Sequence, residues 1–303
     1  MHDHAHGHTH GGGDDARRLA LALALILAFM VGEVVAALVA GSLALLADAG
    51  HMFSDLLGLV IALVALGIAA RPATDRQTFG YQRAEVFGAL ANGLILLAVA
   101  VYVAIEGVQR LFEPSDVLGV PMLIVAGVGL LANVAVMLVL RGGEKTIGMR
   151  GAYLEVLGDL FGSIAAVVAG VVILTTGFSQ ADAIASLVIA ALIIPRAISL
   201  LRDVFHVLSQ AVPSNMNVAE IREHLLGATG VIDVHDVHVW AITSGAPVFS
   251  AHVVVAKTLF ESGGTEKLLD ELGSCMAAHF DVEHSTFQLE PEEHAAHEES
   301  LHR

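Results

Sequence analysis

Residues 43–70 of the chain read LALLADAGHMFSDLLGLVIALVALGIAA, and this stretch decides the fold. A bilayer core about 30 Å thick needs roughly 20 apolar residues per helix, and the stretch exceeds that length. Three ionisable residues interrupt it: Asp48, His51 and Asp55. Because an acid at the centre of a membrane helix costs roughly 2.5–3.5 kcal/mol, each of them needs a functional reason.

Five further apolar segments accompany this one, at residues 19–39, 85–110, 117–140, 150–175 and 181–201. The composition agrees with a membrane protein, since 55% of the residues are hydrophobic and the mean hydropathy is +0.72. A soluble domain of this size has too little interior to bury so many apolar side chains. Gly41-Ser42 joins the first two segments in a hairpin, which argues against a signal peptide. The sequence therefore predicts a six-helix transmembrane bundle.

The formal charge of −16 is distributed unevenly along the chain. Residues 17–203 hold 11 Lys+Arg against 13 Asp+Glu, a net of −2, whereas residues 204–303 hold 4 against 15, a net of −11. An acidic soluble part excludes nucleic acid as a partner and favours cations. The single cysteine, Cys275, excludes an internal disulfide and suits a reducing cytosol.

Basic residues gather in the loops that follow the second and fourth segments and beside the two ends of the bundle: Arg71, Arg76, Arg83, Arg141, Lys145, Arg150, Arg17, Arg18 and Arg202. On the opposite side only Arg110 is found. By the positive-inside rule we expect a multi-pass protein of the cell membrane with both termini in the cytoplasm.

Four regions follow from these patterns. Residues 1–16 form a His-rich cytoplasmic tail, 17–203 the transmembrane domain, 204–290 a cytosolic domain, and 291–303 an acidic, His-containing tail. The cytosolic domain reads α-β-β-α-β, with helices at 216–226 and 264–279 and strands at 231–242, 247–257 and 284–290. This order predicts a small α+β layer with helices on one face of a sheet.

Ionisable pairs in two transmembrane segments predict a metal site. His51 and Asp55 lie four residues apart in one segment, and Glu155 and Asp159 lie four apart in another. Residues at this spacing share a helix face, so the two pairs can provide four ligands for one divalent cation. The alternative is that these groups pair with arginine, and only Arg196 lies inside a predicted span.

Other polar residues of the spans have less specific interpretations. Asp48 shares the face of His51 and is expected beside the metal ligands or on the access side of the site. Glu33 fits a cytoplasmic access path or a hydrogen bond between helices. Asp182 opens the sixth segment, where we expect a helix cap rather than a ligand.

Four motifs then identify a family: SLALLADAGHMFSD at 42–55, FGYQRAE at 79–85, VHDVHVW at 234–240 and SAHV at 250–253. They resemble the cation diffusion facilitator family, and most closely its zinc/cadmium/cobalt-resistance branch of bacterial exporters. The resemblance runs from about residue 17 to 290. It implies a homodimer of six-helix protomers with ferredoxin-like cytosolic domains, which exports a divalent cation by alternating access against an inward flow of protons.

The resemblance also implies that His51, Asp55, Glu155 and Asp159 form the transport site. Zinc members of the family usually carry histidine where this chain has Glu155. A carboxylate oxygen is a harder ligand than an imidazole nitrogen, so we expect Zn²⁺ with Cd²⁺, Co²⁺ or Mn²⁺ as competing substrates.

A second metal site is expected in the cytosolic domain, where Zn²⁺ would regulate transport. His235 and His252 fall on neighbouring strands and Glu290 ends the third strand, a set that resembles the family's cytosolic sites. Three-residue spacing in a regular strand turns His238 to the face opposite His235. His238 and His284 then reach the site only as partners from across a dimer interface.

Three other functions compete with export. A passive channel conflicts with a closed four-ligand site, because fast conduction requires weak binding. A metal-dependent intramembrane hydrolase lacks a recognisable nucleophile, so the chain is not expected to be an enzyme. A membrane-anchored metal sensor would not require ionisable pairs within two spans.

Overall fold

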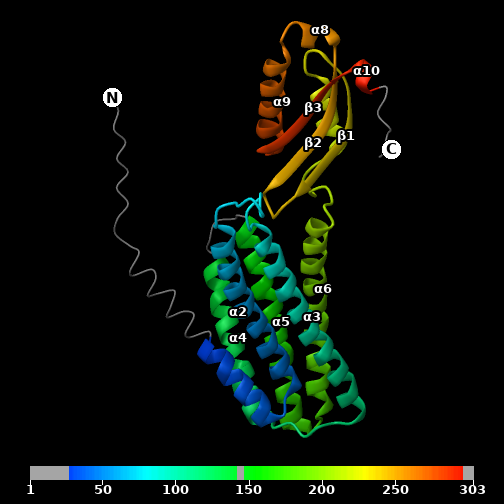
Figure 1. Ribbon diagram of the computed structural model, residues 1–303. Helices are drawn as coiled ribbons and strands as arrows, with labels where there is room; N and C mark the ends of the chain where they lie inside the picture. Colours follow the sequence, from blue (N-terminus) through cyan, green and yellow to red (C-terminus); the bar gives the residue numbers. More distant parts are fainter. Residues whose placement is uncertain (1–26, 142–146, 296–303) are drawn as a thin grey trace. The chain divides into compact units, whose positions relative to one another are not determined.

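The computed structural model describes residues 27–141 and 147–295 (Figure 1). Within these ranges the chain packs as two compact units, one made of residues up to Leu57 together with Asn92–Ile198 and the other of Gly58–Ala91 together with Ser199 onward. The predicted tail at 1–16 and all but the first residues of the tail at 291–303 lie outside the described residues.

Long apolar helices make up the membrane part of the chain (Figure 1). Within the described ranges, five are long and apolar enough to cross a bilayer: α2 (Leu43–Ala69), α3 (Arg83–Phe112), α4 (Gly119–Arg141), α5 (Ile147–Thr176) and α6 (Gln180–Leu208). A shorter apolar helix, Leu27–Ala40, is the described portion of the first predicted span. The predicted fold class, an apolar helical domain followed by a small α+β domain, is confirmed.

Helix α6 extends beyond the predicted end of its span. It runs through Pro195 and continues to Leu208, instead of ending near residue 201. The polar residues after 201 do not break a helix, and the element ends where Gln210 takes a left-handed backbone with φ of 56°. Pro213 then prevents continuation.

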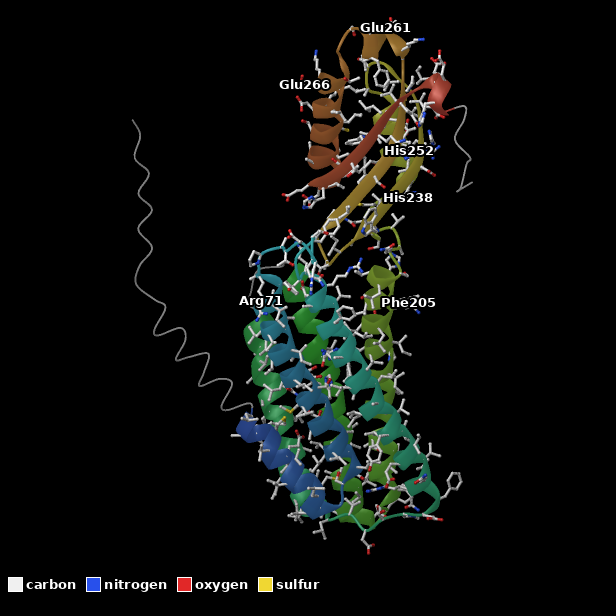
Figure 2. All side chains as sticks on the ribbon, in the orientation of Figure 1. Arg71, Phe205, His238, His252, Glu261 and Glu266 are labelled. Carbon is white, nitrogen blue, oxygen red and sulfur yellow. The ribbon has the colours of Figure 1, made fainter. Side chains whose placement is uncertain are left out.

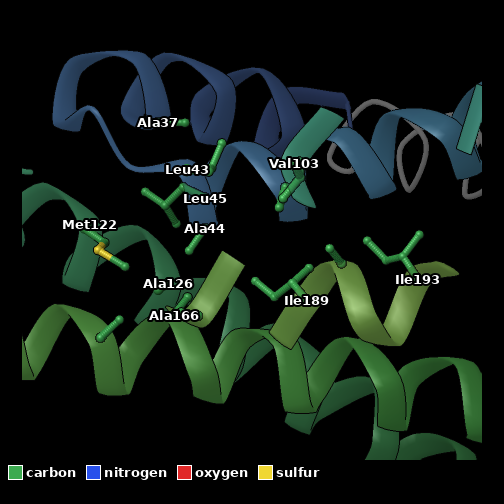
Figure 3. Packing of buried hydrophobic residues seen from close by; sticks show 14 of the residues in the cluster. Ala37, Leu43, Ala44, Leu45, Val103, Met122, Ala126, Ala166, Ile189 and Ile193 are labelled. Carbon is green, nitrogen blue, oxygen red and sulfur yellow. The ribbon is translucent and has the colours of Figure 1, made fainter. Parts of the chain in front are cut away.

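Small side chains form much of the buried core of the first unit (Figure 3). Ala37, Ala44, Ala126 and Ala166 are all nearly inaccessible and pack with larger residues such as Met122 and Ile189. Small residues let membrane helices approach closely, because lipid provides no hydrophobic drive for helix association and packing must supply it.

Asp182 caps a helix other than its own. Its carboxylate accepts hydrogen bonds from Ser42 Oγ at 2.5 Å, Leu43 N at 2.7 Å and Ala44 N at 3.2 Å, which are the first groups of α2. Arg110 Nη1 lies 3.9 Å from the same carboxylate and donates to the carbonyl of Gly41 at 2.6 Å. One acid thus joins the starts of α2 and α6 to the end of α3, in keeping with a cap rather than a ligand.

The C-terminal domain is a three-stranded sheet with helices on one face. Its elements are α7 (Val218–Leu226), β1 (Val231–Ala241), β2 (Pro247–Val255), α8 (Lys257–Glu261), α9 (Thr265–Phe280), β3 (His284–Pro291) and α10 (Glu292–Ala295). The strand order is β1-β2-β3, with β1 and β2 antiparallel and β2 and β3 parallel. The helix-facing core includes Ile221 of α7, Leu272 of α9 and alternate β2 residues from Phe249 to Val255. The even-numbered residues of β2, including His252, therefore face away from the helices.

Candidate metal centres

In the transmembrane centre, two carboxylates lie near the same imidazole nitrogen. His51 Nε2, in α2, lies 3.0 Å from Asp159 Oδ1 of α5 and 3.5 Å from Asp55 Oδ2 one turn further along α2. The His51 side chain is 6% exposed, whereas the Asp159 and Asp55 side chains are 24% and 38% exposed, so the imidazole is buried and the carboxylates are only partly covered. The two helices thus place two carboxylates beside one imidazole nitrogen, and these residue types are suitable ligands for a divalent cation.

Glu155, the fourth predicted ligand, lies in α5 one turn before Asp159, but its side chain is outside the described residues. Arg196 of α6 also reaches the cluster: its Nη1 lies 3.1 Å from His51 Nε2, and its Nη2 lies 3.9 Å from Asp55 Oδ1. The arginine partner that the alternative interpretation requires is therefore present. The sequence marked Arg196 as the arginine inside a predicted span, but the contact itself, between residues 145 apart, depends on the packing of α6 against α2.

Two more buried acids lie on one side of this cluster. Asp48 is buried in α2, one turn before His51, and its Oδ1 lies 3.9 Å from the position that a Cβ on Gly162 of α5 would take. Glu33 is 1% exposed, and neither of its carboxylate oxygens has a hydrogen-bond partner within the described part of the chain. A carboxylate in such surroundings needs a cation or a proton beside it.

The second centre lies on the sheet of the C-terminal domain. His235 of β1 and His252 of β2 are directly paired across the two strands, and their rings meet edge to face with centroids 5.2 Å apart. Glu290 of β3 completes the predicted set: its Oε1 lies 2.6 Å from His235 Nε2 and 3.7 Å from His252 Nδ1. The three residues that the sequence predicted for this site are thus brought together.

Glu290 is 1% exposed, and its second oxygen, Oε2, makes no hydrogen bond within the described residues. His294 Nε2 lies 3.7 Å from that oxygen, one helical turn beyond it. A buried carboxylate surrounded by imidazoles suits a bound divalent cation, because the ion would satisfy the charge and the orphaned oxygen together.

Asp236 is a candidate ligand that the sequence analysis missed. One ligand atom from each of His235, Asp236 and His252 lies within 4.8 Å of the others. Asp236 has a left-handed backbone with φ of 47°, and the β1–β2 register shifts between His235 and His238. An acid directly after a strand histidine should point to the opposite face, so only the bulge brings it to the site. The only hint in the sequence was the residue type at position 236, because aspartate tolerates the left-handed backbone that it adopts in this bulge.

The same bulge overturns the expected orientation of His238. His235 and His238 are three positions apart on β1, but their partners His252 and Ser250 are only two positions apart on β2. His238 therefore shares the face of His235, contrary to the prediction from a regular strand. Figure 2 shows His238 and His252 beside β1 and β2, away from α9.

His284 is not part of this cluster within the domain. It begins β3 and pairs with Val248, whereas Glu290 near the end of β3 pairs with Val254. Six residues of extended chain, roughly 20 Å, separate the two positions.

Comparison with known proteins now places the chain. The model of the cation efflux transmembrane domain matches residues 19–209, and that of the cation efflux protein cytoplasmic domain matches residues 213–292. The chain belongs to the cation efflux family. The resemblance to cation diffusion facilitators is thereby confirmed, and with it the interpretation as a multi-pass membrane transporter rather than an enzyme.

Known transporters are similar in sequence to this family member over most of its length. It is 38% identical over 263 residues to the metal cation efflux system protein CzcD of Cupriavidus metallidurans, covering 86% of this chain and 82% of that one. It is 35% identical over 269 residues to a cadmium, cobalt and zinc/H(+)-K(+) antiporter of Bacillus subtilis, covering 88% and 86%. The zinc transporter ZitB of Escherichia coli is 37% identical over 265 residues, covering 86% and 83%. The family member therefore exports metal cations, and its cytoplasmic domain fits the expected homodimer.

Proposed function

We propose that this protein is a proton-coupled antiporter that exports divalent cations, with Zn²⁺ as the leading substrate, from the cytoplasm by alternating access. The convergence of Asp55 and Asp159 on His51 Nε2 carries this proposal. Glu155, one turn from Asp159 on α5, supplies the fourth ligand. An ion held by four side chains from two helices is released when those helices move relative to each other.

Proton coupling follows from the chemistry of the ligands. A metal ion requires an imidazole lone pair and ionised carboxylates, so protons and metal compete for the same atoms. Protonation of the transport site on the outer side assists release of the ion. Deprotonation on the cytoplasmic side, where both termini lie, restores the ligands.

The ligand set favours zinc without excluding harder ions. Histidine and carboxylates together satisfy Zn²⁺, while a carboxylate at Glu155 moves the site towards ions that prefer oxygen. The relatives named for zinc, cadmium and cobalt support this range. Cd²⁺, Co²⁺ and Mn²⁺ are the expected competitors.

The strand cluster of His235, Asp236, His252 and Glu290, hereafter the cytosolic site, is proposed as a regulatory metal site. Its neighbour His238 lies on the same face of the sheet and provides a further donor. Metal bound here would stabilise one arrangement of the paired cytosolic domains and so bias transport, provided that the arrangements differ in metal affinity.

The decisive experiment is metal flux in sealed proteoliposomes with an imposed pH gradient. Wild-type protein should accumulate Zn²⁺ against its gradient when protons flow the other way, and Glu155→His should shift preference from Mn²⁺ towards Zn²⁺. Flux that ignores the pH gradient would refute proton coupling. A wild-type protein that moves no metal under these conditions would contradict the proposed antiport.

A further inference from the structure

A basic side chain lies beside two of the proposed transport-site ligands. Arg196 of α6 directs one guanidinium nitrogen to His51 Nε2 at 3.1 Å and another towards Asp55 Oδ1 at 3.9 Å. Its side chain is 37% exposed, so most of it is covered by the surrounding helices. Neither the family assignment nor export by itself explains a fixed cation at this position.

The arginine and a metal ion require the same atoms. A neutral imidazole with its proton on Nδ1 offers one lone pair, at Nε2. A metal ion would bind Nε2 at roughly 2.0–2.1 Å, and Arg196 Nη1 and Asp159 Oδ1 already lie 3.1 Å and 3.0 Å from that atom. The two positive groups also both depend on the Asp55 carboxylate. Their simultaneous presence is excluded by geometry and opposed by charge repulsion.

We propose that Arg196 is an internal cation that competes with the transported ion for His51 and Asp55. This inference rests on the proposed function, because it takes these two residues to be metal ligands. The metal displaces the guanidinium when it binds from the cytoplasm, and the returning guanidinium helps to expel the metal on the other side. Arg196 is thus a positioning residue that sets affinity and release without contacting the ion.

The helix that carries Arg196 contains a proline next to this residue. Pro195 precedes it inside α6, where proline removes one backbone hydrogen bond and favours a kink. A side chain beside such a point can be moved by a small change in helix direction. Arginine suits the role because its guanidinium stays charged at any pH the cell provides.

Equilibrium binding of Zn²⁺ to the purified full-length protein tests the competition. The transport-site component is defined as the binding that Asp159→Asn removes, since the cytosolic site and the His-rich tail also bind zinc. Within that component, Arg196→Gln should bind Zn²⁺ about 10-fold or more tightly, equivalent to about 1.4 kcal/mol. Arg196→Lys should restore part of the weaker affinity.

Arg202→Gln is the matched control, because it removes the same charge from an exposed position of the same helix. It should leave the zinc affinity unchanged. Tighter binding cannot result from damaged folding, so a gain confined to position 196 supports the competition. If Arg196→Gln has an unchanged or weaker zinc affinity while Asp159→Asn still removes the transport-site binding, the competition is refuted and the proposed function stands.

Flux measurements give a second readout. In proteoliposomes, Arg196→Gln should lower both the KM for Zn²⁺ and the maximal rate, because the ion binds more tightly and leaves more slowly. A lower rate with an unchanged KM would contradict the proposal. If Asp159→Asn retains both transport and full binding, the proposed transport site itself is wrong, and that outcome is distinguishable from failure of the Arg196 role.

Discussion

The two candidate metal centres use the same residue types on different scaffolds. The transmembrane centre takes His51 and Asp55 from one helix and Asp159 from another, whereas the cytosolic site takes its residues from three hydrogen-bonded strands. Helices packed through small residues can tilt and slide, so a site shared between them can be taken apart. Strands in one sheet hold their register, so a site built across them keeps its geometry.

The surroundings differ in charge as well. Arg196 reaches into the transmembrane centre, whereas residues 231–295, which contain the whole cytosolic site, include no arginine in their sequence. A transport site must release its ion in every cycle, and an internal competitor serves that purpose. In the proposed regulatory site, the imidazoles of His235, His252 and His294 lie within 3.7 Å of the buried Glu290 carboxylate.

Asp159→Asn should separate the two centres most strongly, because it should abolish zinc transport. It removes the carboxylate nearest to His51 while keeping the shape of the side chain, so Zn²⁺ flux in proteoliposomes should fall to the level of protein-free vesicles. Zinc binding to the cytosolic site should be unaffected. Substantial residual flux would mean that the transmembrane centre does not carry the ion.

Glu290→Gln should produce the opposite pattern. Loss of the buried charge should weaken Zn²⁺ binding to the cytosolic site by about 10–100-fold, the range typical of changes around metal ligands. Isothermal titration of the full-length protein in an Asp159→Asn background removes the transport-site component, and the binding that Glu290→Gln then removes measures the cytosolic site. Flux at saturating zinc should persist, and its complete loss would contradict a purely regulatory role.

Asp236→Asn should have a smaller effect of the same kind. Asparagine tolerates the left-handed backbone at this position, so the bulge is kept while the charge is lost. Zinc affinity of the cytosolic site should fall about 10-fold. Glu283→Gln, which removes an exposed acid just before β3, is the control and should change nothing. Equal effects of both variants would indicate a general charge effect rather than ligation.

Cys275 offers the smallest and most indirect test. Burial and the neighbouring Glu271 carboxylate raise the pKa of this thiol above its ordinary value, so less thiolate is present at pH 8 than in a free cysteine. Alkylation should be slower than for a model thiol and should accelerate several-fold in Glu271→Gln. Saturating Zn²⁺ should not protect Cys275, because it lies on α9 while the cytosolic site is on the other face of the sheet. Full protection by zinc would show that a thiolate takes part in binding.

Local patterns predicted most of the secondary structure, because a strand is marked by the alternation of its residues and a membrane helix by the length of its apolar segment. The strands at 231–241, 247–255 and 284–291 and the long apolar helices fall close to their predicted positions. The face of His238 was predicted wrongly, because a register shift leaves no mark in the alternation of residues around it. Asp236 was missed for the same reason.

The sequence by itself determined that this protein is a membrane bundle with an acidic soluble domain. Its hydropathy, the basic loops and the paired ionisable residues at four-residue spacing are properties of contiguous segments. Only the tertiary structure decided which distant groups share a site: Arg196 beside His51, Asp182 at the start of α2, and Asp236 turned towards His252. Those contacts depend on helix packing and strand register, which are set by the whole chain because each buries surfaces contributed by segments far apart in sequence.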